Sequence, residues 1–191
     1  MQHKSITAKL LLTLIALGLL IWLGGSIIRT AIAYDLYVPG TALKLKNWYS
    51  DQERIHAVRM FGMGAMYTDI AYGTALASSI LLCIYWRKNL KKRGWLFMSF
   101  VLMFLAAPVE LYMIYLDIKL NLGLFWTNIA NFDTPVIKDY FTYRFTKLAI
   151  PSTMSYLAVI TSILFIIWRP LDLKEASEAE SLKPDFNVKK N

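Results

Sequence analysis

The sequence predicts an all-α integral membrane protein, a four-helix bundle with an interfacial amphipathic helix in its second outer loop. Two observations predict this fold class. Hydrophobic residues make up 57% of the 191 residues and the mean hydropathy is +0.43, which is too apolar for an ordinary soluble domain. Several apolar stretches also approach the ~20 residues that an α-helix needs to cross a bilayer. The predicted spans are residues 10–28, 62–86, 95–118 and 148–168, within one transmembrane domain of residues 1–170.

The charge and the scarcity of reactive residues exclude several classes of protein. The formal net charge is +8, but Lys and Arg are almost absent from the apolar stretches. This pattern is typical of cytoplasmic loops that contact anionic lipid, not of nucleic-acid binding. Cys83 is the only cysteine, which excludes an intramolecular disulfide and a CxxC redox or zinc site. His3 and His56 are the only histidines, which argues against a haem held between membrane histidines. We therefore expect no metal, cofactor or nucleic-acid partner.

The first apolar stretch, residues 10–28, has two interpretations. Its length suits a membrane anchor. The small residues Ala31 and Ala33 resemble a signal-peptide cleavage site instead. The long apolar run and the position of Arg29 favour the uncleaved anchor, which leads into a polar loop at residues 29–59.

The second span has a clear start. Ser50 followed by Glu53 is the pattern of a capping box, in which each side chain accepts from the backbone N–H of the other. We therefore expect the helix to begin near Asp51, outside the membrane. A continuous helix to Trp86 is longer than the ~30 Å hydrocarbon core requires.

The loop at residues 87–93 sets the predicted orientation. It carries five basic residues and no acidic one, and such loops stay in the cytoplasm. Both termini are then cytoplasmic, in a plasma or inner membrane. The residues expected to contact lipid headgroups are Arg87, Lys88, Lys91, Lys92 and Arg93.

The second outer loop, residues 119–147, is crowded with aromatic residues. Thr134 and Pro135 are typical of a helix N-cap and first helical position. The helix that they begin would place Val136, Tyr140 and Tyr143 on one side, which favours an amphipathic segment in the membrane interface. A plain aromatic belt is the alternative. Beyond the fourth span, residues 171–191 are charged and lack apolar periodicity, so we expect a disordered cytoplasmic tail.

Acidic residues inside the apolar stretches are the candidate functional groups. Asp69 and Glu110 lie ~10 and ~12 Å from the same outer face at ~1.5 Å per residue, and the fourth span brings polar side chains to nearly that level. An ionised carboxyl at such depth is costly unless it is paired or faces a polar cavity. The predicted ligand-binding residues are Asp69, Glu110, Tyr72, Tyr112, Ser155 and Tyr156, and no catalytic residue is predicted.

These acids admit a structural and a functional interpretation. In the structural interpretation, each acid is protonated and its hydrogen bonds hold the helices together. In the functional interpretation, the two acids line a pocket that relays protons or binds a ligand. Small residues allow close helix approach along two rows. The rows are Gly73 with Ala77, and Ala71 with Ala75 and Ser79.

Three functions remain open. The first is an accessory or assembly subunit of a larger membrane complex, with membrane lipids and other subunits as partners. The alternative is a binder or carrier of an apolar or cationic small molecule in a pocket lined by Asp69 and Glu110. A lipid-modifying enzyme that uses these carboxyls as acid and base is the third. No nucleophile, metal cluster or cofactor motif supports catalysis.

Overall fold

The computed structural model describes residues 6–90, 93–127 and 129–169, and these residues are almost entirely helical. The long helices are α1 (Ile6–Asp35), α2 (Asp51–Tyr85), α4 (Gly94–Trp126) and α6 (Ala149–Trp168). The short ones are α3 (Arg87–Leu90), η1 (Ile137–Thr142) and α5 (Tyr143–Thr146). Each of the four long helices is long and apolar enough to cross a membrane, so the chain has the architecture of an integral membrane protein.

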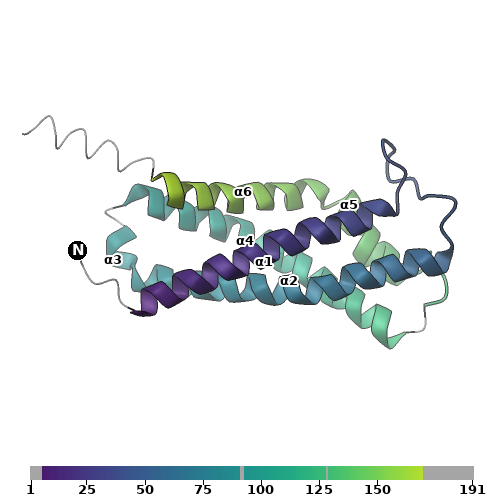
Figure 1. The fold of residues 1–191 in the computed structure, drawn as a ribbon, viewed down its shortest axis with the longest axis horizontal. Helices are drawn as coiled ribbons and strands as arrows, with labels where there is room; N and C mark the ends of the chain where they lie inside the picture. Colours follow the sequence, from purple (N-terminus) through teal and green to yellow (C-terminus); the bar gives the residue numbers. More distant parts are fainter. Residues whose placement is uncertain (1–5, 91–92, 128, 170–191) are drawn as a thin grey trace, which may run out of the picture.

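The long helices alternate in direction and form two pairs (Figure 1). Helix α1 packs along α2, and α4 packs along α6, while α2 also contacts α4. The start of α1, helix α3 and the end of α6 lie at one end of the molecule, here named the α3 end. The α1–α2 connection and α5 lie at the opposite end, here named the loop end.

Helices α1 and α4 extend beyond their predicted spans. Helix α1 continues to Asp35 and α4 to Trp126, whereas the predicted spans end at residues 28 and 118. The prediction of a loop from Arg29 was therefore wrong. Arg29 and Asp117 are 4% and 2% exposed, because they pair with each other inside the protein. A charged residue thus did not mark the end of a helix here.

The predicted start of α2 is confirmed. The backbone N–H of Glu53 donates to Ser50 Oγ, and the backbone N–H of Ser50 donates to Glu53 Oε2 over 2.7 Å. In the preceding loop, Lys46 Nζ and the Tyr49 hydroxyl both donate to the Asp35 carboxylate. The hydrogen bond with Asp35 raises the pKa of Lys46, so this loop contact is retained at neutral pH.

The second outer loop contains a helical segment that begins where the sequence predicts. The Thr134 carbonyl accepts from the backbone N–H groups of Ile137 and Lys138. The buried side of this segment consists of Ile137, Phe141 and Arg144. It packs on the long helices, since the Phe141 ring lies 5.2 Å from that of Phe61.

The adjacent side of the segment is more exposed. Val136 and Tyr140 are half-buried, and Tyr143 is 37% exposed. These residues were predicted to form one side of an amphipathic helix in the membrane interface, and that role stays a prediction.

Glycines on α1 allow it to approach α2 closely. A Cβ atom on Gly18 would lie 2.6 Å from the Ala71 carbonyl oxygen, and one on Gly25 would lie 2.5 Å from a Thr68 methyl group. Ala71, Ala75 and Ser79 form the buried row on α2. Gly73 belongs to the other predicted row and faces outward, since a Cβ atom placed on it would meet no described atom within 4 Å.

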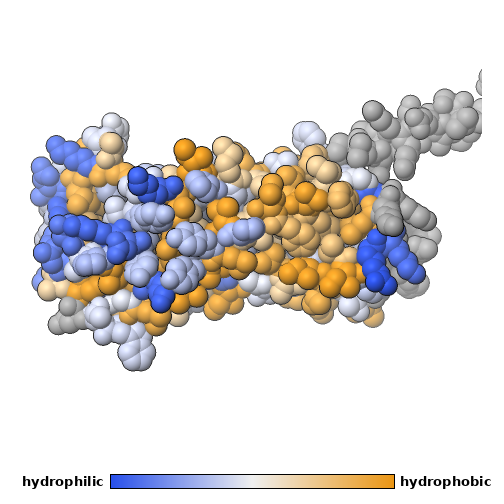
Figure 2. All heavy atoms as spheres, turned by 180° about the vertical axis from the view of Figure 1, so that it is seen from behind, coloured by the Kyte–Doolittle hydropathy of each residue, from blue (hydrophilic) through white to orange (hydrophobic). Residues whose placement is uncertain are grey.

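The surface is divided unevenly along its length (Figure 2). On the face shown, hydrophobic residues gather over the half of the molecule nearer the α3 end, and polar residues gather towards the loop end. Helix α2 has 35 residues and is therefore ~52 Å long at ~1.5 Å per residue. This exceeds a ~30 Å hydrocarbon core, so part of the helix extends beyond it.

Candidate functional site

Asp117 is the centre of a buried charge cluster towards the loop end. Arg29 from α1 donates to Asp117 Oδ2 over 2.7 Å, and Arg144 from α5 donates to both carboxylate oxygens over 2.6 Å. Burial opposes the charge on Arg144, but the adjacent carboxylate outweighs this effect and raises the pKa of the guanidinium. Arg144 is therefore a fixed positive charge. One carboxylate joins α1, α4 and α5.

An aromatic ring covers both arginines. The guanidinium carbons of Arg29 and Arg144 lie 4.3 and 5.5 Å from the centroid of the Phe61 ring. Gly64, one turn further along α2, leaves room for Arg29, since a Cβ there would lie 3.0 Å from Arg29 Cγ. Cation–π attraction and the ion pairs thus stabilise the same two guanidinium groups.

Asp69 is bound more loosely than Asp117. Its Oδ1 lies 4.0 Å from Arg29 Nη1, which instead donates a 2.8 Å hydrogen bond to Thr68 Oγ1. The Asp69 side chain makes no hydrogen bond to any residue that the structure describes, and it is 16% exposed. Asp69 is therefore the carboxylate of this region that retains free acceptor capacity.

Asp69 also lines a groove between α2 and α4. The groove has a volume of about 500 Å³. Its wall is apolar apart from Asp69 and Asn121, and it includes Met66, Ile70, Ile114, Ile118, Leu122, Phe125 and Trp126. Asn121 Nδ2 donates to the Gly62 carbonyl, and its buried Oδ1 has no partner. Asp69 is therefore the one charged side chain among the described residues that line the groove.

Glu110 belongs to a second constellation, which we name the Glu110 layer. Trp22 Nε1 on α1 donates to Glu110 Oε2 over 3.3 Å. The Trp22 ring lies between Tyr72 on α2, at 5.3 Å, and Tyr156 on α6, at 5.1 Å. Ser155, buried on α6, lies beside the Glu110 carboxyl. All four long helices therefore contribute to this layer.

Several polar atoms of the Glu110 layer lack well-aligned partners. Among the described residues, the Tyr72 hydroxyl and Glu110 Oε1 have no well-aligned hydrogen-bond partner, and Ser155 Oγ lies close to the Glu110 carboxyl without a well-aligned hydrogen bond to it. An unsatisfied buried polar group costs about 1–3 kcal/mol. These polar atoms can therefore form further hydrogen bonds, either with a proton on the Glu110 carboxyl or with a small polar molecule.

The structure brings most of the predicted site residues together, but in two places. Glu110, Tyr72, Ser155 and Tyr156 meet in the Glu110 layer, and the shared depth of Glu110, Ser155 and Tyr156 was expected from the sequence. Asp69 does not hydrogen-bond to Glu110 and lies beside Arg29 instead. The reason is that Gly62 of α2 lies beside Asn121 of α4 and not beside residue 118, so the two positions from which the depths were counted are not level.

Tyr112 lies away from both places. It is 44% exposed and its ring stacks on Tyr115 at 6.1 Å. Trp22, Arg29 and Arg144 also belong to these two places, although the sequence did not predict them. One signal was available for the centre of the charge cluster, since Asp117 lies seven residues after Glu110 and so shares its helix face.

The α3 end carries the predicted lipid-headgroup residues. Arg87 and Lys88 lie on α3 and Arg93 is the N-cap of α4, and all are exposed. Lys91, Lys92 and the predicted tail at residues 171–191 lie outside the described residues. Within the described part of the chain, no cluster of three His, Cys, Asp or Glu side chains is placed to share a metal ion.

Comparisons with models of protein families, with curated proteins and with solved structures found no match for this chain.

Proposed function

We propose that this protein is a four-helix membrane bundle that binds an apolar, cationic small molecule, with Asp69 as the counter-ion. In this proposal the α3 end faces the cytoplasm of a plasma or inner membrane, because basic loops are retained there. The ligand lies in the groove between α2 and α4, and its ammonium group meets the carboxylate.

One observation carries the proposal, namely the contrast between the two aspartates. Asp117 takes short hydrogen bonds from two arginines. Asp69 has only a 4.0 Å ion pair, although it lines an otherwise apolar groove. Apolar walls with few polar groups are typical of small-molecule sites. An apolar groove with one carboxylate in its wall favours a ligand that is apolar and carries a positive charge.

The charge count agrees with a cationic ligand. Three carboxyls, those of Asp69, Glu110 and Asp117, and two guanidiniums, those of Arg29 and Arg144, make up the charge cluster and the Glu110 layer. If all of them are ionised, one negative charge remains. A buried uncompensated charge is expensive, so a proton or a bound cation stabilises the folded protein.

The test compares dodecylamine with dodecanol, which has the same chain but no charge. The purified protein in dodecyl maltoside should gain several degrees in unfolding temperature with dodecylamine and little with dodecanol, because a ligand at 100 times its Kd contributes about 2.7 kcal/mol. Asp69→Asn should lose this difference. Asp139→Asn, which removes an exposed carboxylate on η1, is the matched control and should keep it. Equal stabilisation of wild type and Asp69→Asn would reject the proposal.

A second candidate function is an accessory subunit of a membrane complex. The observation that favours it is the outward face of α2, where Gly73 has open space, Ala77 is exposed and Ile70 is 70% exposed. Small residues on such a face allow a partner helix to approach closely.

The two candidates predict opposite results in co-purification from mild detergent. Gly73→Leu with Ala77→Leu should release a retained protein if α2 docks a partner helix, and Asp69→Asn should not. If neither variant changes the set of retained proteins, the accessory function is rejected.

A further inference from the structure

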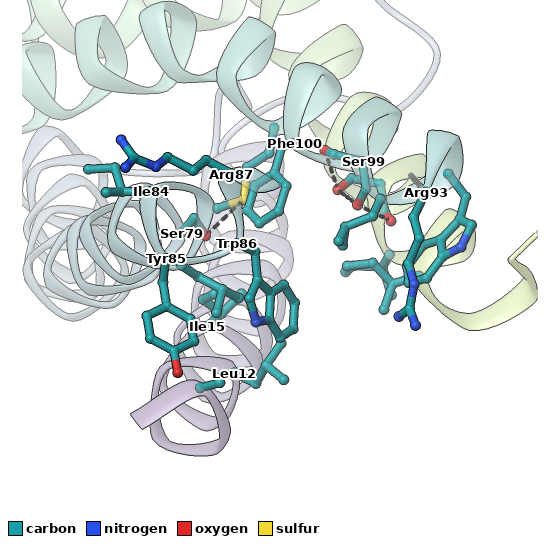
Figure 3. A pocket seen from close by; sticks show the side chains of 18 of the residues that line it. Leu12, Ile15, Ser79, Ile84, Tyr85, Trp86, Arg87, Arg93, Ser99 and Phe100 are labelled. Atoms are coloured by element: carbon teal, nitrogen blue, oxygen red, sulfur yellow. Dashed lines mark hydrogen bonds between the residues drawn. The ribbon is translucent and has the colours of Figure 1, made fainter. Parts of the chain in front are cut away.

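A large cleft separates the two helix pairs at the α3 end (Figure 3). Its volume is about 1200 Å³, larger than the ~300–1,000 Å³ of ordinary small-molecule pockets. In Figure 3, Leu12, Ile15 and Trp86 lie on one side of the space and Ser99 lies on the other. The cleft is separate from the groove at Asp69, with which it shares no lining residue.

The interior of the cleft suits hydrocarbon. Its walls are mainly aliphatic and aromatic side chains from α1, α2, α4 and α6. The serines that line it are already satisfied. Ser99 and Ser162 hydrogen-bond to each other and to each other's carbonyls, and Ser79 donates to the Ala75 carbonyl. The interior therefore offers little to a polar guest.

The mouth of the cleft is positively charged. Arg87, Lys88, Arg93 and Arg169 line it, and none of the described residues that line the cleft is acidic. In Figure 3, Arg87 and Arg93 lie on opposite sides of the space. Arg169 ends α6, with its guanidinium 5.3 Å from the centroid of the Trp95 ring. Lys88, Arg93 and Arg169 are exposed at this end, so their charges are available to an anion.

We propose that the cleft binds an anionic phospholipid of the bilayer, with its phosphate among these basic residues and its acyl chains between the two helix pairs. The basic residues complement the anionic headgroup of such a lipid, and the apolar walls of the cleft complement its acyl chains. Basic pockets between membrane helices on the cytoplasmic side are a known setting for anionic headgroups. The proposal does not depend on the cation site at Asp69.

The test compares dioleoyl phosphatidylglycerol with dioleoyl phosphatidylcholine, which have identical chains. Native mass spectrometry of the full chain in dodecyl maltoside should show at least tenfold tighter binding of phosphatidylglycerol. Each basic residue near a membrane surface contributes a factor of roughly five. Arg93→Gln with Arg169→Gln should therefore weaken phosphatidylglycerol binding roughly 25-fold, and should leave phosphatidylcholine binding unchanged.

Matched variants separate this site from general charge attraction. Lys44→Gln with Lys147→Gln removes the same charge from exposed positions outside the cleft and should leave the affinity unchanged. Ile166→Trp fills the cleft and should weaken binding, whereas Ile167→Trp, on the neighbouring exposed position that does not line it, should not. If the arginine variants fail to fold, the comparison of Ile166→Trp with Ile167→Trp still tests the proposal.

Several results would overturn the proposal. Equal affinity for the two lipids would remove the headgroup preference. An equal loss in the Lys44/Lys147 variant would indicate general charge attraction. Equal effects of Ile166→Trp and Ile167→Trp would mean that no acyl chain enters the cleft. Binding of glycerol 3-phosphate at the same concentrations would indicate a site for free phosphate.

Discussion

The pairing of individual acids decides what each contributes to this protein. Asp117 is 2% exposed and is bonded to Arg29 and Arg144, so its charge is compensated where water is excluded. Asp69 has one loose ion pair and partial exposure. Removing one partner of a buried ion pair leaves the other charge uncompensated and costs about 3–5 kcal/mol. An exposed or loosely paired acid contributes about 0–1 kcal/mol.

The first prediction follows from this contrast. Asp117→Asn should lower the stability of the protein by about 3–5 kcal/mol, because two buried guanidiniums lose their carboxylate. Asp69→Asn should change it by less than about 1 kcal/mol. Thermal unfolding in detergent measures both variants. A loss in Asp69→Asn as large as that in Asp117→Asn would show that the pairing has been assigned to the wrong residue.

The second prediction concerns the Glu110 layer. Glu110→Gln should be neutral or stabilising, because the amide still accepts from Trp22 and its NH₂ group has the unpartnered Tyr72 hydroxyl and Ser155 Oγ nearby. Trp22→Phe should cost about 1–3 kcal/mol, because a further Glu110 oxygen is then left without a donor. The same unfolding measurement applies. If Glu110→Gln is the more damaging change, the carboxyl is ionised and required as a charge.

At the scale of the helices, one face of α2 is packed closely against α1. Gly18 and Gly25 of α1 touch this face through Ala71, Ala75 and Thr68. The outward face, with Gly73, has open space beside it. Interiors are packed densely, so a methyl group without space forces a shift of the backbone.

The third prediction tests that packing. Gly18→Ala should destabilise the protein by about 1–3 kcal/mol, since overpacking of a well-packed contact typically costs this much. Gly73→Ala should be tolerated or slightly stabilising, because it adds a methyl group in open space and favours the helix. Both variants replace a helical glycine by alanine, so the difference between their unfolding temperatures measures the effect of the position alone. Similar losses at the two glycines would contradict the α1–α2 contact.

Helix ends show what the sequence could and could not predict. The start of α2 followed from Ser50 and Glu53, because a capping box is a local interaction. The ends of α1 and α4 did not, because Arg29 and Asp117 are polar residues whose partners lie far away in the chain. Local patterns fix local structure, and a charge inside a helix is explained only by its tertiary partner.

At the scale of the whole molecule, polar contacts connect the two helix pairs. Arg29 with Asp117, and Trp22 with Glu110, both join α1 to α4. The cleft between the pairs lies on the α3 side of both contacts. Buried polar contacts of this kind are costly when broken, so they determine how the pairs are positioned and where the space between them remains.

Like the helix ends, the candidate site was predictable from the sequence only in part. Glu110, Ser155 and Tyr156 come to one level because regular helices convert sequence distance into depth. Arg144 was not predictable, since it reaches the cluster from α5, in the second outer loop. Its place depends on how that loop folds back onto the helices.

A double-mutant cycle measures the central contact between the helix pairs directly. Arg29→Gln and Asp117→Asn, alone and combined, should show a coupling free energy of about 2 kcal/mol or more, as residues of one buried network do. The parallel cycle of Arg29→Gln with Asp69→Asn should show about 0.5 kcal/mol or less, in the range of nearly independent sites. A larger coupling to Asp69 than to Asp117 would contradict the arrangement described here, and with it the assignment of Asp69 to a ligand.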